Sequence, residues 1–140
     1  MTREENIETA RKSVRFLEQK RFKEFGELFV ENGKWVNPYH SGLFPPVTVG
    51  ATKIADLIET FAENFDEIQF PIEEILPFED SSRLAMKHGG KLKLKNGNGT
   101  YENDYLTIFS FDEHGKILEW IEYLNPIYAA KAFGLMDKIC

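Results

Sequence analysis

One glutamate near the end of the chain has neighbours that suit proton chemistry. Glu122 lies in an alternating segment in which Leu118, Trp120 and Leu124 share its side of a predicted strand. A carboxylate among apolar side chains loses hydration, which raises its pKa toward neutrality. Such a group can give or take a proton near pH 7, so Glu122 is our first catalytic candidate. The plainer alternative is a solvated carboxylate on an edge strand, because unpaired Glu is rarely buried.

A histidine occupies the apolar side of an earlier predicted strand. Within residues 83–95, His88 alternates with the surrounding residues so that it shares a face with Leu84 and Met86. His is the side chain that titrates nearest to neutral pH. His88 is therefore our second catalytic candidate, as a proton carrier facing Glu122, and the alternative is a core histidine with a satisfied hydrogen bond.

The strand predicted next in the chain brings polar side chains to the same region. Alternation over residues 100–111 places Tyr101, Asn103 and Tyr105 on one face. Phenol and amide groups can orient a substrate carbonyl or carboxylate, although buried ones often bond only to each other. We predict that these three residues and Trp120 bind substrate.

Motifs for metals and cofactors do not occur in this sequence. The three His residues show neither HxH nor HExxH spacing, and the single cysteine, Cys140, excludes a cluster of thiolate ligands. There is no phosphate-binding loop and no GxGxxG fingerprint. We therefore predict no metal site and no cofactor.

The predicted secondary structure begins with helices. A capping box at Thr2–Glu5 and apolar residues at helical spacing predict a first helix to about Lys20. A short second helix or bend follows and is expected to end at a turn at Asn32–Gly33. Residues 34–39 are predicted to form a strand, the Gly- and Pro-rich residues 40–46 a loop that borders an opening, and residues 53–65 another helix.

From Ile68 onward the hydrophobic period changes to two. Turn signals separate four predicted strands over residues 68–78, 83–95, 100–111 and 116–125. Helices followed by an antiparallel meander predict an α+β fold, in which a curved, mostly antiparallel sheet wraps the helices. We predict one domain over residues 1–140. The outer face of the meander carries apolar residues such as Leu106, which favours a subunit contact there.

Composition narrows the class of partner. The net charge of −6 and the isoelectric point near 5.1 disfavour nucleic acid and anionic membranes as partners. An aromatic content of 14% indicates a bulky core or a ring-lined cavity, and thus a small-molecule ligand. A single cysteine and the lack of a hydrophobic leader favour the cytoplasm.

Several segments together resemble a known family. They are residues 28–33, Gly50 with residues 53–55, residues 101–103 with Leu106, and residues 115–126. This pattern is similar to that of the SnoaL-like branch of the NTF2-like superfamily, and most of all to the phenazine-biosynthesis proteins of the PhzA/PhzB type. The resemblance implies a conical α+β barrel with a deep pocket and commonly a homodimer packed through the outer sheet face.

The resemblance also implies roles for individual residues. Glu122 matches the position of an acidic residue that acts as acid or base in related enzymes. Trp35 and Asn37 match two positions that hold a water in relatives similar to limonene epoxide hydrolase, and we count them as substrate-binding residues. Leu57 stands where the phenazine-type proteins carry a His. The Arg and Asp pair of the epoxide hydrolases and the helix Tyr of the steroid isomerases are also missing, which disfavours both reactions.

These observations predict a pocket protein with cofactor-independent acid/base chemistry, as an isomerase, lyase or condensing enzyme. Its substrate is expected to be a small carbonyl-containing or cyclic metabolite. The alternative, from a different class, is a ligand-binding or dimeric scaffold module of the same fold that performs no chemistry.

Overall fold

The computed structural model describes residues 1–138, which form four α-helices and seven strands. Along the chain these are α1 (Arg3–Glu18), α2 (Phe22–Gly26), β1 (Phe29–Val36), β2 (Val47–Val49), α3 (Ala51–Ala62), β3 (Phe65–Gln69), β4 (Ile72–Pro77), β5 (Arg83–Leu94), β6 (Thr100–Phe111), β7 (Ile117–Leu124) and α4 (Pro126–Ala132). Single 3₁₀ turns lie at Lys95–Gly97 and Met136–Lys138.

The first helix begins as its sequence indicates. The side chain of Thr2 accepts a hydrogen bond from the backbone N–H of Glu5, and the Glu5 carboxylate accepts one from the backbone N–H of Thr2. This capping box satisfies N–H groups that have no partner within the helix. The apolar stripe that includes Ala10, Val14 and Leu17 is buried against the sheet. The prediction of this helix is confirmed.

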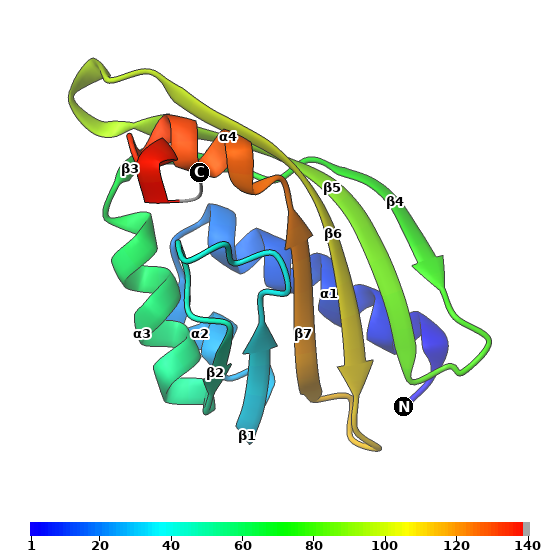
Figure 1. Cartoon of the computed structure of the whole chain (residues 1–140). Coiled ribbons are helices and arrows are strands. Elements are labelled where there is room, and N and C mark those ends of the chain that lie inside the picture. Colours follow the sequence, from blue (N-terminus) through cyan, green and yellow to red (C-terminus); the bar gives the residue numbers. More distant parts are fainter. Residues whose placement is uncertain (139–140) are drawn as a thin grey trace.

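A single curved sheet carries the rest of the fold. Its strand order is β2-β1-β7-β6-β5-β3, with β4 also paired to β5, and every pairing is antiparallel except that of β1 with β7. Helices α1, α2 and α3 lie on the concave side, and α4 lies at one end (Figure 1). The α+β class and the mostly antiparallel sheet are confirmed. The NTF2-like cone is not a closed barrel of strands, because β2 and β3 end the sheet without pairing to each other.

Two predicted boundaries near the N-terminal half are wrong. Asn32–Gly33 lies inside β1, and the chain is already extended at Phe29. The register of β1 against β7 shifts between Phe29 and Lys34, so this segment is a bulge and not a turn. A Cβ atom at Gly33 would come within 3.1 Å of Phe29 and the Val30 carbonyl, and this crowding explains why glycine fits there. Helix α3 ends at Ala62, and Phe65 begins β3.

The predicted strand over residues 68–78 is two strands. Pro71 lacks the N–H that a continuous ladder needs, and β3 and β4 lie on either side of it. Both pair with β5, at different parts of its length. The short strand β2 and helix α4 have no counterpart in the prediction. Helix α4 begins with Asn125, whose side chain accepts from the N–H of Ile127, and with Pro126 in the first turn.

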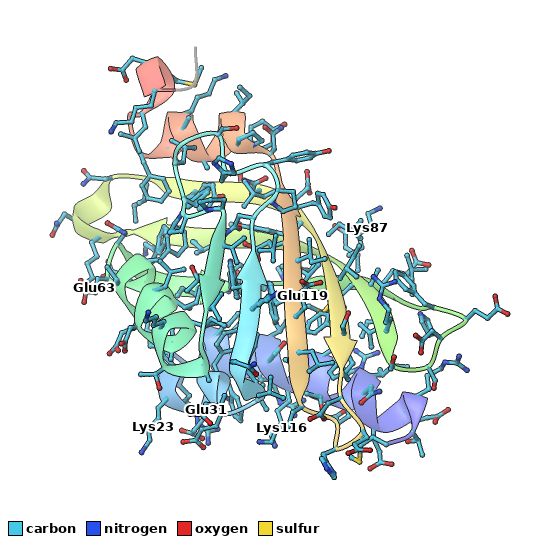
Figure 2. The ribbon with its side chains drawn as sticks, turned by 60° about the horizontal axis from the view of Figure 1, so that its bottom comes forward. Lys23, Glu31, Glu63, Lys87, Lys116 and Glu119 are labelled. Atoms are coloured by element: carbon cyan, nitrogen blue, oxygen red, sulfur yellow. The ribbon has the colours of Figure 1, made fainter. Side chains whose placement is uncertain are left out.

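An irregularity in the last strand also changes which side chains face inward. The register of β6 against β7 shifts between Ser110 and Phe111, so Ile117 is fully buried and Leu118 is 43% exposed. The prediction that Leu118 shares the inner face of β7 is wrong. Beyond the bulge the predicted alternation holds, and Trp120 and Leu124 are buried. Charged side chains such as Glu63, Lys87 and Lys116 project outward from the molecule (Figure 2).

Candidate functional site

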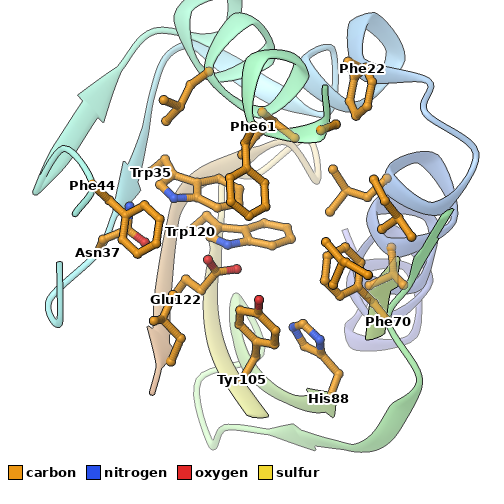
Figure 3. A pocket seen from close by; sticks show the side chains of 18 of the residues that line it. Phe22, Trp35, Asn37, Phe44, Phe61, Phe70, His88, Tyr105, Trp120 and Glu122 are labelled. Atoms are coloured by element: carbon orange, nitrogen blue, oxygen red, sulfur yellow. The ribbon is translucent and has the colours of Figure 1, made fainter. Parts of the chain in front are cut away.

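A pocket lies between the concave face of the sheet and the helices. Its volume is about 100 Å³, and it is lined largely by aromatic and aliphatic side chains (Figure 3). The rings in its wall belong to Phe22, Trp35, Phe44, Phe61, Phe70, Tyr101, Tyr105 and Trp120. Phe44 and Pro45 come from the loop after β1, so the expectation that this loop borders the pocket agrees with the structure.

The structure brings most of the predicted site residues together. Those that line the pocket are Glu122, His88, Trp35, Asn37, Tyr101, Tyr105 and Trp120. They come from β1, β5, β6 and β7, or from the residue that follows β1, so four neighbouring strands build the site. Asn103 does not line it. Leu57 contributes an apolar side chain to the wall.

Glu122 is the only Asp or Glu among the residues that line this pocket. Glu122 is half-buried, and it lines a pocket whose walls are mostly aromatic rings. Burial raises the pKa of Glu122 from 4.5 to about 7. The indole N–H of Trp120 faces the carboxyl group and partly opposes this rise, although its Nε1 does not reach full hydrogen-bond geometry. Glu122 can therefore accept or release a proton near neutral pH.

Two stacked indole rings form the wall above Glu122. Trp35 and Trp120 are paired residues in the parallel β1–β7 register, and their rings stack 4.8 Å apart at an interplanar angle of 12°. Phe25 packs edge-on against both. Asn37, 4% exposed, donates from its side-chain amide to the carbonyl of Pro45 and thereby ties the loop to the end of β1.

His88 is buried beside Tyr105. Its ring stacks on the Tyr105 ring at 4.9 Å and meets Phe70 edge-on. Nδ1 lies 2.9 Å from the carbonyl of Gly89, which can only accept, so Nδ1 carries a proton. Burial lowers the pKa of His88, which keeps the ring neutral and leaves the lone pair on Nε2. Nε2 then accepts from the Thr107 hydroxyl at 3.4 Å.

The phenols of Tyr101 and Tyr105 are joined in a small buried network. Their hydroxyl oxygens are 3.1 Å apart, and the Asn103 amide donates to the Tyr101 hydroxyl at 2.7 Å. The other hydrogen bonds of the Asn103 side chain go to the carbonyl and N–H of Asn125 and to the N–H of Asp104. Asn103 thus holds Tyr101 in place from outside the pocket.

Thr107 is a site residue that the sequence prediction missed. It is fully buried, bonds to His88, and is the cross-strand partner of Glu122 in the β6–β7 register. The signal that would have found it is the alternation that already placed Tyr105 on this face, since Thr107 is two residues further along β6. Threonine is common in strands, so its presence there does not by itself indicate a functional site.

The described residues contain no group of three or more His, Cys, Asp or Glu side chains that converge as metal ligands. Cys140 lies outside the described residues. No helix within residues 1–138 is long and apolar enough to cross a membrane.

Residues 10–120 match the family model of the SnoaL-like domain, and the chain therefore belongs to the SnoaL-like family. YesE, an uncharacterised protein of Bacillus subtilis (strain 168), is 24% identical over 131 residues, which cover 94% of this chain and 88% of YesE.

Two crystal structures share the fold. One is a Bacillus subtilis protein provisionally described as an isomerase, with a TM-score of 0.84 and 23% identity over 96% of this chain and 97% of that one. The other is a phenazine biosynthesis-related protein from Pseudomonas aeruginosa, with a TM-score of 0.81 and 26% identity over 95% and 83% of the two chains. The resemblance to SnoaL-like and phenazine-type proteins is thus confirmed.

Proposed function

We propose that the protein is an enzyme in which Glu122 performs acid/base chemistry, without a cofactor, on a small carbonyl-containing or cyclic metabolite. The reaction class is isomerisation, elimination or condensation. The observation that carries the proposal is a single carboxyl group, with a pKa raised to about 7, in a pocket walled by rings. Members of one fold family can differ in chemistry, so the proposal depends on this site and not on the fold.

The chemistry follows from the two protonation states of Glu122. The carboxylate removes a proton from a carbon next to the substrate carbonyl, and the electron pair of that C–H bond becomes the C=C bond of an enolate. Where the substrate also carries a C=C bond conjugated with this enolate, the neutral acid returns the proton to the far carbon of the dienolate, and the double bond moves. A pKa near 7 keeps both states accessible during one turnover.

The surrounding residues support this step in different ways. Trp35 and Asn37 shape the wall near the loop, and Trp120, which stacks on Trp35, borders the space for the ligand. The Nε2 lone pair of the neutral His88 accepts the hydrogen bond from Thr107, and His88 assists as a proton acceptor when the Thr107 hydroxyl turns away. Asn103 acts as a positioning residue for Tyr101.

A proton-exchange experiment tests the proposal without knowledge of the natural substrate. The protein is incubated in D₂O with a panel of small cyclic ketones, and NMR follows deuterium incorporation next to the carbonyl. We expect the wild type to accelerate exchange and the E122Q variant to lose at least about 100-fold of the enzymatic rate. Glu119→Gln removes a carboxylate that does not line the pocket and is the matched control. Equal exchange rates for wild type and E122Q refute the role of Glu122.

A non-catalytic binding module is the second candidate. It is favoured by the lack of a second acidic side chain in the pocket wall and by Leu57, which replaces a possible acid/base group with an apolar one. Under this hypothesis, ketones bind and quench the fluorescence of the two pocket tryptophans, but no member of the panel undergoes accelerated exchange.

We also propose that the chain forms a homodimer through the outer face of the sheet. Leu106 and Leu118, 37% and 43% exposed, lie on this face. Sedimentation equilibrium tests the dimer. Leu106→Glu is expected to shift the mass toward the monomer, whereas Lys53→Glu, on helix α3, leaves it unchanged.

A further inference from the structure

The hydroxyl groups of Tyr101 and Tyr105 have two protons to donate but only one hydrogen-bond acceptor within the protein. The two phenols supply two hydroxyl protons, and the hydrogen bond between them uses one. The amide of Asn103 is a donor to Tyr101 and so takes up no hydroxyl proton. Apart from the bond between them, neither hydroxyl donates to a protein acceptor in the described part of the chain. In the recorded arrangement Tyr105 donates to Tyr101, which leaves the O–H of Tyr101 to donate; rotation of both hydroxyls reverses their bond and leaves the O–H of Tyr105 instead.

This free O–H belongs to the pocket. Both tyrosines line it, and the hydroxyl of Tyr105 points toward the space beside Glu122 (Figure 3). Tyr105 and Glu122 occupy diagonal positions on the paired strands β6 and β7, since Tyr105 pairs with Leu124 and Glu122 with Thr107. Diagonal neighbours of this kind are roughly 7–8 Å apart, a span that one small ligand can bridge.

The pocket also restricts the charge and size of what it can hold. No Lys or Arg occurs among its lining residues, and the only group that becomes charged near neutral pH is Glu122. An anionic ligand would find no cation and would face a like charge. The cavity of about 100 Å³ is close to the size of an engineered apolar cavity of about 150 Å³ that binds benzene. The available space suits one ring.

We propose that the Tyr101–Tyr105 hydroxyl pair binds the carbonyl oxygen of a neutral, single-ring ketone or enone and donates to the oxygen on which negative charge develops. Both phenols remain protonated, because burial raises the pKa of each. When Glu122 removes the proton next to the carbonyl, the electron pair moves to the oxygen, and the hydroxyl pair stabilises it. The inference rests on the proposed function and adds to it the class of substrate.

Binding to the purified protein tests this inference without any turnover. Both tryptophans of the chain line the pocket, so their fluorescence reports occupancy directly. The probes are cyclohex-2-enone, cyclohexene, which lacks the oxygen, and cyclohexanecarboxylate, which carries a charge. At pH 8 we expect the enone to bind at least about tenfold more tightly than the other two probes, and infrared spectroscopy to show its carbonyl band at lower frequency when bound.

The tyrosines are then changed singly and together. Tyr101→Phe or Tyr105→Phe leaves one hydroxyl that can still donate, so each single variant should weaken enone binding only about threefold. The double variant should weaken it about tenfold or more and return the carbonyl band to its frequency in an apolar solvent. Tyr123→Phe, on the outer side of β7, is the control. Circular dichroism and thermal unfolding confirm that each variant is folded.

The outcomes separate this inference from the proposed function. A carbonyl shift that persists in E122Q supports the tyrosine site even if that variant exchanges protons as fast as the wild type. Unchanged enone affinity and carbonyl frequency in the folded double variant overturn the inference, as does binding of cyclohexanecarboxylate at least as tightly as the enone.

Discussion

Changing Glu122 to Gln should stabilise the protein more at pH 8 than at pH 4.5. In the folded chain the carboxyl group binds its proton up to a pKa of about 7, whereas the same group in the unfolded chain ionises at 4.5. Between these values the folded state holds more protons, so the stability of the wild type falls as pH rises. Below pH 4.5 both states are protonated, and above about pH 7 both are ionised, so the difference is constant on either side.

The size of the effect follows from the same two values. At 1.36 kcal/mol for each pKa unit, the wild type loses about 3 kcal/mol relative to E122Q between pH 4.5 and pH 8. This figure is a ceiling, because part of Glu122 is accessible through the pocket and is screened by solvent. Gln is close to Glu in shape and does not titrate, so all other ionisations in the chain cancel in the comparison.

Urea unfolding at several pH values between 4.5 and 8.5 measures this difference. Each free energy of unfolding is taken for wild type, E122Q and the control Glu119→Gln, which removes one negative charge from the same strand. A wild-type minus E122Q difference that stays constant with pH, or that grows more favourable to the wild type at high pH, refutes the argument that Glu122 is desolvated. The catalytic proposal would lose its physical basis at the same time.

Three other predictions concern the surroundings of Glu122. Trp120→Phe removes the N–H that opposes the shift, so the pKa of Glu122 should rise above about 7 in a ¹³C NMR titration; an unchanged or lower value contradicts this. Gly90→Ala should cost about 1–3 kcal/mol in urea unfolding, because its Cβ would lie 2.5 Å from the Tyr105 ring, while Gly89→Ala, with 3.4 Å to its nearest neighbour, should cost less. ¹⁵N NMR should find His88 neutral at pH 7 with the proton on Nδ1, and a charged ring would show that the buried geometry is wrong.

Much of the site could be predicted because successive side chains of a strand point alternately to its two faces. That rule placed His88 on the inner face of β5, Tyr105 on that of β6 and Glu122 on that of β7. It needs only the local sequence, since successive side chains in any strand point to opposite sides. The first helix was predictable for the same reason, because its capping box and apolar period are both local features.

Other features depend on contacts between distant segments. The parallel pairing of β1 with β7 sets Trp35 against Trp120, and no local pattern in either strand indicates that partner. The bulge in β1 keeps Gly33 within a strand, and the bulge in β7 turns Leu118 outward; both are irregularities in the register between paired strands.

The α+β class, the inner faces of the long strands and the isolated acid among apolar neighbours could all be predicted from the sequence, since all three follow from the short-range periodicity of the backbone. The contacts of the folded chain are needed to show that Asn103 supports Tyr101 from outside the pocket, that Thr107 bonds to His88, and that the two phenols bond to each other. Hydrogen-bond partners are set by the packing of strands against one another, and a single strand does not carry that information.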